Sequence, residues 1–214
     1  MLEISKVPIV LHTMDSYSKF WNNWFLLFKK FCINHGPIFF LSEEKEPDFV
    51  SDVTHIKTGK GEWGERLIYG LSKIESDLII YMQEDFWCIN ELILNDTYIK
   101  LFTDLNMSQL HIKGLPIEVK RNLSLTNIED NLYKFNQDSK YTQNHQFGLW
   151  RKDKLLDNVL PNENPWGNEI NGTKRLNKKP HNIYIINHEW YTTVSRRGQL
   201  MERGKEIIKK YNLK

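Results

Sequence analysis

The order of apolar and polar positions in the first half of the chain alternates between short strands and amphipathic helices. It predicts strands at Val7–His12, Pro37–Leu41, Val53–Lys57, Asp77–Met82 and Gln109–Lys113. Between them it predicts helices, with apolar residues three and four positions apart, at Tyr17–Phe31, Glu62–Ile74 and Asp96–Asn106. Strands that alternate with helices favour an α/β fold with a mostly parallel central sheet flanked by helices.

The second half of the chain is less regular. Its pattern predicts strands at Leu132–Phe135 and His145–Arg151, and helices at Asp153–Leu160 and Gln199–Tyr211. A further helix should start at Asn164-Pro165, because Asn caps helix starts and Pro suits the first helical position. We also predict that Asn182–Ile186 and Trp190–Val194 pair as a hairpin.

Composition places the chain among ordinary globular proteins. Its 214 residues are 40% hydrophobic and 26% charged, which fits one domain with a full core. The two cysteines, Cys32 and Cys88, lie in apolar stretches, which favours buried free thiols in a reducing compartment. The apolar run near the N-terminus is too short for a signal sequence or a membrane span. We therefore expect a cytoplasmic protein, at most peripheral to a membrane.

Charge is unevenly distributed along the chain. Residues 174–214 carry 11 Lys and Arg against 3 Asp and Glu, whereas residues 1–173 carry 18 against 24. A basic C-terminus suggests an anionic partner such as a phosphate group or a membrane surface, although an ordinary solvated basic helix has the same composition. Nucleic acid is the weaker choice, because the basic residues form no recognised motif and the acidic body would repel phosphate.

The apolar strand Leu78–Met82 runs directly into Gln83, Glu84 and Asp85. Ligands of open α/β sheets bind beyond the carboxyl ends of the strands, so these side chains should face a ligand. Neighbouring carboxylates suit a hard divalent cation such as Mn²⁺ or Mg²⁺, which commonly bridges to phosphates. The alternative is that Glu84 and Asp85 cap the next turn or pair with surface lysines.

A second motif suggests a different enzyme class. Gly59–Gly64 matches G-x-G-x-x-G between a strand and a helix, and Glu84 follows Gly64 by 20 positions, as in dinucleotide-binding proteins. An NAD(P)-binding oxidoreductase is therefore our alternative. The motif follows the third predicted strand instead of the first, and Lys60 and Trp63 would crowd a pyrophosphate.

Several segments, taken in order, resemble GT-A-fold glycosyltransferases, especially small bacterial or viral enzymes that build surface polysaccharides. The matching segments are Val7–Tyr17, Trp63–Arg66 with the following helix, Tyr81–Trp87, Gln146–Trp150 and Asn164–Glu169. The resemblance implies a GT-A fold in which residues 1–115 bind the nucleotide sugar and residues 116–214 form the acceptor side. The implied reaction moves a sugar from a nucleotide-diphosphate donor of the UDP type to a glycan or lipid-linked acceptor hydroxyl.

On the donor side, the resemblance places Gln83, Glu84 and Asp85 where these enzymes carry their D-x-D motif. Asp85 matches the second acid, and Gln83 stands in place of the first, so the strength of metal binding is left open. The resemblance implies a Mn²⁺ or Mg²⁺ site at Asp85 with His188 as a late ligand. It also implies three donor contacts: Thr13 near the base, Arg66 toward the diphosphate or ribose, and Arg196-Arg197 as a basic turn over the diphosphate.

On the acceptor side, Asn164–Glu169 resembles the segment that ends in the catalytic carboxylate of inverting members. Glu169 would then be the general base, and Gln146, Trp150 and Trp166 would contact the acceptor. Trp166 and Glu169 are three positions apart near a helix start, so they share a face. An aromatic platform beside a carboxylate suits a sugar hydroxyl, and the helix dipole should help keep Glu169 ionised.

Overall fold

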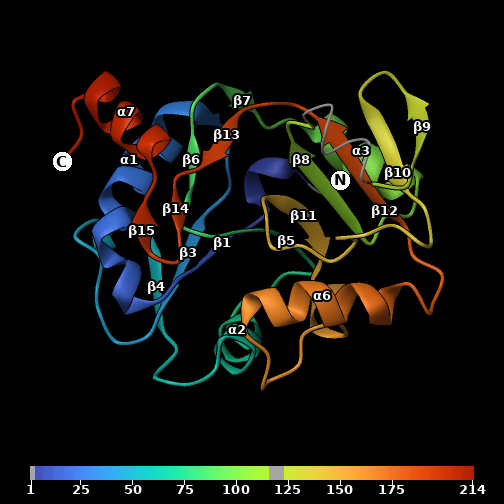
Figure 1. The fold of residues 1–214 in the computed structure, drawn as a ribbon, viewed down its shortest axis with the longest axis horizontal. Helices are drawn as coiled ribbons and strands as arrows, with labels where there is room; N and C mark the ends of the chain where they lie inside the picture. Colours follow the sequence, from blue (N-terminus) through green and yellow to red (C-terminus); the bar gives the residue numbers. More distant parts are fainter. Residues whose placement is uncertain (1–2, 116–122) are drawn as a thin grey trace.

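The computed structural model describes residues 3–115 and 123–214, which form a central sheet flanked by helices (Figure 1). The α-helices are α1 (Trp21–Phe31), α2 (Trp63–Ser72), α3 (Asp96–Asp104), α5 (Lys152–Leu156), α6 (Pro165–Leu176) and α7 (Glu202–Tyr211). The central strands are β1 (Ile9–His12), β3 (Ile38–Ser42), β4 (Thr54–Lys57), β5 (Leu78–Met82), β8 (Gln109–Lys113), β9 (Leu125–Glu129), β10 (Leu132–Phe135), β11 (Gly148–Arg151) and β12 (Ile183–Asn187).

In the part of the chain that the structure describes, shorter strands form three pairs outside the central sheet. The pairs are β2 (Cys32–Ile33) with β7 (Leu92–Ile93), β6 (Phe86–Cys88) with β13 (Tyr191–Thr193), and β14 (Ser195–Arg196) with β15 (Gln199–Leu200). Strand β6 follows β5 in the chain after the three residues Gln83, Glu84 and Asp85, so the β6–β13 pair lies next to this acidic turn.

Within the described residues the central sheet has nine strands in the order β4-β3-β1-β5-β11-β8-β12-β10-β9. The pairs β3–β4, β1–β3, β1–β5 and β8–β12 are parallel, while β11 and β10 are antiparallel to both of their neighbours. Most strands therefore point the same way, which confirms the predicted mostly parallel α/β sheet. Strand β11 comes late in the chain and lies between β5 and β8.

The middle of the sheet is buried on both faces, as near-continuous apolar strands require. In β1, Ile9 and Leu11 face one core cluster and Val10 faces another. In β5, Ile80 and Met82 join the first cluster, and Ile79 and Tyr81 join the second. Side chains of α1, α3 and α7 complete the first cluster, and those of α2 and α5 complete the second.

Two expectations about the second half are wrong. Asn182–Ile186 and Trp190–Val194 do not pair, because β12 joins β8 and β10 in the central sheet while β13 pairs with β6. The last helix begins at Glu202 instead of Gln199, because Gln199–Leu200 pairs with Ser195–Arg196. The predicted boundary after residue 115 adjoins residues outside the described part of the chain.

The glycine motif before α2 is used for packing. A Cβ on Gly64 would lie 2.0 Å from the carbonyl oxygen of Leu160, so the helix start touches that backbone. The amides of Gly64 and Glu65 already donate to the carbonyl oxygens of Glu163 and Pro161, at 3.1 and 3.0 Å. Because these N–H groups are occupied, the start of α2 does not offer the free amides that a pyrophosphate needs. The oxidoreductase alternative loses its main support.

Both cysteines are buried free thiols, as expected. Among the described residues, no helix has the length and apolar character that crossing a membrane requires.

Candidate active site at the end of strand β5

The acidic turn is fixed at both of its ends. Strand β5 is fully buried, and Glu84 and Asp85 form the turn between it and β6. The carbonyl oxygen of Glu84 accepts a hydrogen bond from Trp87 Nε1 at 3.1 Å, and that of Asp85 accepts one from the Val194 amide at 2.9 Å. The two carboxylates are therefore held by the backbone at the edge where ligands of such sheets bind.

The two carboxyl groups lie in an unfavourable electrostatic environment. Glu84 is 5% exposed, and burial is the main reason that its pKa is raised, followed by the charge of Asp85. Burial likewise raises the pKa of Asp85, and the charge of Glu169 adds to it. Asp85 Oδ1 is buried without a hydrogen-bond partner. A bound cation would stabilise such a site, because its charge would neutralise the two carboxylates.

Thr13 and Arg66 lie beside this turn because β1 pairs with β5. Thr13 Oγ1 accepts a hydrogen bond from Trp21 Nε1 at 2.9 Å, and the Thr13 side chain acts to lower the pKa of Glu84. Arg66 Nη2 donates to the Thr13 carbonyl at 2.8 Å, and Nη1 lies 3.4 Å from Glu43 Oε1. Arg66 is 1% exposed and packs against the end of β1, and its Nε and Nη1 atoms have no hydrogen-bond partner.

Glu169 comes from α6 and faces the acidic turn. Its Oε1 accepts a hydrogen bond from the His145 amide at 3.0 Å. Its charge raises the pKa of Asp85, and Lys113 at the end of β8 acts to lower the pKa of Glu169. Burial outweighs these favourable contacts, so the pKa of Glu169 is raised. The helix dipole is weak at this residue because it acts within the first turn, and Glu169 lies in the second.

A buried polar network fixes α6 in this position. The helix starts as predicted, with Asn164 Oδ1 accepting from the Gly167 amide at 2.8 Å. Asn168, next to Glu169, is fully buried; its Oδ1 accepts from His145 Nε2 at 2.9 Å, and its Nδ2 donates to Glu163 Oε2. Arg175 binds both carboxylate oxygens of Glu163, at 2.8 and 2.7 Å. Burial lowers the pKa of His145 to about 3, so its ring is neutral in this network.

The residues assigned to the acceptor lie in different surroundings. Gln146 lies near the acids, and its Oε1 accepts a hydrogen bond from the Tyr191 hydroxyl at 3.0 Å. Trp166 is 59% exposed on α6, one helical turn before Glu169, where a platform could form. Trp150 is 1% exposed and packs in the core with Trp63 and Leu155, because β11 turns this side chain toward α2 and α5. The structure does not bring Trp150 to a surface that an acceptor reaches.

His188 lies apart from the acids. It is exposed after β12, and its Nε2 lies 3.3 Å from the carbonyl oxygen of Glu91. No contact in the described structure joins it to Asp85. Its part in a metal site remains a prediction that this geometry does not support.

Arg196 and Arg197 lie on the β14–β15 hairpin. Arg197 and Gly198 form its two-residue turn with φ of 52° and 74°. A Cβ on Gly198 would lie 3.7 Å from the ring of Tyr17, whose pKa is raised by burial and then by Glu84 and Asp85. Both arginines are exposed and line a surface hollow of about 420 Å³. The hairpin therefore exposes two guanidinium groups, and its tip adjoins Tyr17, which interacts with the acids.

The residues of the site suit a metal ion that both the protein and a bound ligand would coordinate. Asp85 offers a buried oxygen that has no hydrogen-bond partner. Within residues 3–115 and 123–214, no three His, Cys, Asp or Glu side chains are placed to hold an ion together. A divalent cation at Asp85 would take its other ligands from phosphate oxygens and water, which is the usual arrangement for Mg²⁺.

Sequence reasoning missed two residues of the site, Lys113 and Tyr191. Lys113 is the last residue of β8, a strand that was predicted with its correct bounds. The rule that ligands meet the carboxyl ends of parallel strands, applied to β8 as well as to β5, would have identified it. No local signal marks Tyr191, because it reaches the site only through the pairing of β13 with β6.

No protein-family model and no curated protein matches the chain. Among solved structures, S. aureus TarS 1-349 has a TM-score of 0.58 at 13% identity over 87% of this chain, which spans 59% of that TarS chain. The same protein in complex with UDP-GlcNAc has a TM-score of 0.60 at 12% identity, with coverage of 95% and 64%. TarS is a GT-A glycosyltransferase.

Nucleotide-sugar pyrophosphorylases are similar to the same extent. UDP-glucose pyrophosphorylase complexed with UDP-glucose has a TM-score of 0.61 at 8% identity, covering 97% of this chain and 99% of that one. HddC from Yersinia pseudotuberculosis has a TM-score of 0.59 at 12% identity, with coverage of 96% and 99%. Likeness at these identities concerns the fold alone. The chain has the GT-A-like α/β fold that these nucleotide-sugar enzymes share.

Proposed function

We propose that this protein is a glycosyltransferase that uses a nucleotide-diphosphate sugar of the UDP type. The observation that carries the proposal is that Glu169 from α6 faces Asp85 at the end of β5, on a GT-A-like sheet. The likeness to TarS in complexes with UDP-GlcNAc and with UDP supports a nucleotide-sugar donor.

The donor would lie over the acidic turn. Asp85, with Glu84 and Gln83 beside it, would hold Mn²⁺ or Mg²⁺ against the diphosphate, and Thr13 would border the base. A bound metal ion would supply positive charge to the leaving diphosphate. Arg196 and Arg197 would contact the same phosphates from the hairpin, since guanidinium groups match phosphate oxygens.

Glu169 would act as the general base of an inverting transfer. Its carboxylate takes the proton of the acceptor hydroxyl while the acceptor oxygen forms a bond to the anomeric carbon. The bond from that carbon to the diphosphate oxygen breaks, and its electron pair leaves on the diphosphate. Burial raises the pKa of Glu169 toward neutral pH, which suits a base, and the His145 amide keeps the carboxylate oriented. Trp166 and Gln146 would hold the acceptor glycan or lipid-linked sugar.

Two variants test these roles. Glu169→Gln should lower transfer from an active UDP-sugar by roughly 100-fold or more, because a positioned base contributes at least that much. Asp85→Asn should lower turnover and abolish the response to Mn²⁺, while the exposed Glu75→Gln serves as a matched control. UDP binding, measured by calorimetry, should survive in Glu169→Gln. Near-wild-type turnover of Glu169→Gln would disprove the base assignment.

The first measurement is a thermal-shift screen of nucleotides and nucleotide sugars with and without Mn²⁺. Stabilisation by UDP or a UDP-sugar supports the donor site. If no nucleoside diphosphate stabilises the protein, the donor site is not where we place it. Fluorescence quenching by NADH but not by UDP would instead revive the oxidoreductase alternative at Gly59–Gly64.

A second candidate function is nucleotidyl transfer. It is favoured by the match to UDP-glucose pyrophosphorylase, which spans nearly the whole of both chains. Against it, the segment directly after β1 carries no Lys or Arg before Lys19, so it brings no cation of its own to a triphosphate. Release of pyrophosphate from UTP and glucose 1-phosphate would establish this activity, and its absence together with UDP-sugar turnover would exclude it.

A further inference from the structure

A cavity of about 630 Å³ lies beside the proposed reaction site. Its walls include Lys113, Gln146, Glu189, Tyr191, Thr192 and Arg203. They come from the end of β8, the segment before β11, strand β13 with the residues preceding it, and the start of α7. The size is in the range of small-molecule sites, and the lining offers polar and apolar surface in about equal parts.

Two residues that line the cavity, Lys113 and Tyr191, also lie close to the carboxylates of the site. Lys113 interacts with Glu169, because the charge of each shifts the pKa of the other toward its ionised form. Tyr191 borders Asp85, whose charge adds to the effect of burial in raising the pKa of the phenol. Its hydroxyl donates to Gln146 Oε1, so these two side chains form a shared wall. A molecule in the cavity would present one end to Glu169.

The charged residues that line the cavity are two cations, Lys113 and Arg203, and one carboxylate, Glu189. Glu189 Oε1 lies 3.6 Å from Arg203 Nη2, so part of the arginine charge is already balanced. Lys113 is half-buried, and its interacting carboxylate is Glu169, whose pKa is raised by burial. A partly desolvated ammonium group makes a stronger contact with an anion than one in bulk water. A phosphate group at this end of the cavity would add an anionic partner for Lys113.

We propose that the cavity holds the acceptor, and that the acceptor carries a phosphate group recognised by Lys113 and Arg203. This inference rests on the proposed glycosyltransferase function. The reacting hydroxyl would point toward Glu169, with the phosphate further along the cavity and the polar side chains of Gln146 and Thr192 beside the carbon chain. A neutral sugar acceptor would gain little from the two cations, whereas an acceptor with a phosphate group would pair with them.

Binding of small probes tests the proposal without requiring activity. With UDP present, glycerol 3-phosphate should bind at least tenfold more tightly than glycerol, by ligand-observed NMR or calorimetry. Lys113→Met should weaken glycerol 3-phosphate by about 10- to 100-fold, the range for a lost charged hydrogen bond. Glu189→Gln should strengthen it by about two- to fivefold, since an exposed opposing charge is removed.

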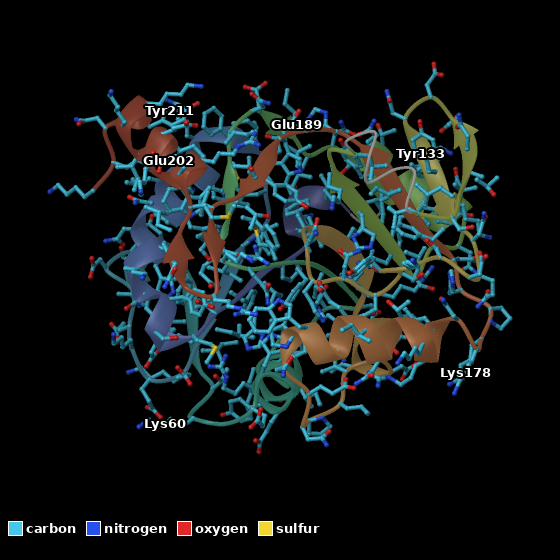
Figure 2. The ribbon with its side chains drawn as sticks, viewed as in Figure 1. Lys60, Tyr133, Lys178, Glu189, Glu202 and Tyr211 are labelled. Carbon is cyan, nitrogen blue, oxygen red and sulfur yellow. The ribbon has the colours of Figure 1, made fainter. Side chains whose placement is uncertain are left out.

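Controls separate this inference from the proposed function. Lys178→Met removes an exposed lysine far from Glu189, as Figure 2 shows, and should leave binding unchanged. UDP binding should be unaffected by Glu189→Gln. Equal binding of glycerol and glycerol 3-phosphate, or no response to Lys113→Met and Glu189→Gln, would overturn the acceptor inference even where UDP binds. Tighter binding of inorganic phosphate than of glycerol 3-phosphate would also overturn it, whereas failure of UDP to bind would count against the proposed function itself.

Discussion

At the scale of single residues, the two carboxylates of the acidic turn have an unfavourable electrostatic free energy in the folded protein. Glu84 and Asp85 are buried next to each other, and burial raises the pKa of both. Buried Arg66 acts to lower the pKa of Glu84, but this contact does not outweigh burial. Residues that keep such a cost commonly serve a ligand, because binding relieves the repulsion that folding leaves in place.

The buried Glu84 carboxyl should make the stability of the protein depend on pH. An acid whose pKa is raised by folding binds more protons in the folded state than in the unfolded state. The folded protein therefore loses stability as the pH rises from the ordinary pKa of the acid to its raised pKa. The Glu84→Gln variant has no carboxyl group at this position, so it should not lose stability in this way as the pH rises. The midpoint of thermal unfolding of Glu84→Gln, relative to wild type, should therefore be higher at pH 8 than at pH 5.

The comparison between the two proteins cancels the titration of other groups, including the buried histidines. The exposed Glu75→Gln should show no such dependence on pH. An unchanged difference between pH 5 and pH 8 for Glu84→Gln would mean that the Glu84 carboxyl is not strained in the folded protein.

Sequence reasoning located the carboxylates better than the aromatic residues. Glu84 and Asp85 follow an apolar strand, so local pattern was enough to place them at the end of β5. Glu169 was assigned by the resemblance to GT-A glycosyltransferases, because local pattern predicts only the capped helix start before it. Trp150 was placed at the acceptor, but it lies in the core because the two faces of a buried strand have the same apolar pattern. Which face a tryptophan occupies depends on the strands beside it.

At the scale of elements, the β14–β15 hairpin has an unusual turn. Both central residues have positive φ, as a type I′ turn requires, and Asn-Gly is the sequence that suits it. Arg197 occupies the position that asparagine favours. An arginine there costs about 1–2 kcal/mol of backbone energy, which suggests that its guanidinium group is retained for a contact with a ligand.

Arg197→Asn should separate stability from binding. The variant should be more stable by about 0.5–1 kcal/mol, because asparagine tolerates this backbone conformation better. The same change should weaken UDP binding by about fivefold or more, through loss of a charged hydrogen bond. Chemical denaturation and calorimetry measure the two effects.

Arg196→Asn is the matched control, since Arg196 lies in β14 and has no positive φ. It should bring no gain in stability. If Arg197→Asn binds UDP as tightly as wild type, the hairpin tip does not contact the donor.

At the scale of the whole molecule, positive charge gathers where the last turns of α1 and α7 meet. Tyr211 packs against Phe31 with ring centroids 5.5 Å apart, and Lys30 and Lys210 lie over the Tyr211 ring at 5.1 and 5.0 Å. Lys29 and Lys209 are exposed beside them, as is Leu26 on α1. The basic C-terminus seen in the sequence is thus extended by α1, at the end of the molecule that carries the C-terminus (Figure 1).

This basic end should associate with anionic lipid vesicles. Each lysine near such a surface contributes about 1 kcal/mol at physiological salt. Changing Lys29, Lys30, Lys209 and Lys210 together to Glu should lower binding to phosphatidylglycerol-containing vesicles by roughly tenfold or more. Sedimentation with vesicles of phosphatidylglycerol and phosphatidylcholine, and of phosphatidylcholine alone, measures this.

The control variant changes Lys174, Lys178 and Lys179 to Glu. These lysines lie at and just after the end of α6, in a basic segment far from Tyr211 (Figure 2). This variant should bind vesicles as wild type does. Failure of the wild-type protein to sediment with anionic vesicles at low salt would disprove the membrane contact.

The class of fold could be predicted from the sequence, but the strand order could not. Apolar runs separated by amphipathic helices are enough to indicate a mostly parallel sheet, and the bounds of β8 and β10 were predicted correctly. The partner of β12 was misjudged because pairing depends on contacts between residues far apart in the chain, which local pattern does not encode. Tyr191 was not predicted as a site residue for the same reason, because β13 and β6, which pair, are far apart in the chain.

The insertion of β11 between β5 and β8 has a consequence for how the protein is made. Gly148 is in register with Tyr81 and with His111, so the middle of the sheet closes only after residue 151 has left the ribosome. Until then β5 and β8 each expose an unpaired apolar edge, the kind of surface that seeds aggregation. Contacts this distant in sequence also slow folding. Recombinant production should therefore benefit from low temperature or chaperone coexpression, and fragments that end before β11 should be insoluble.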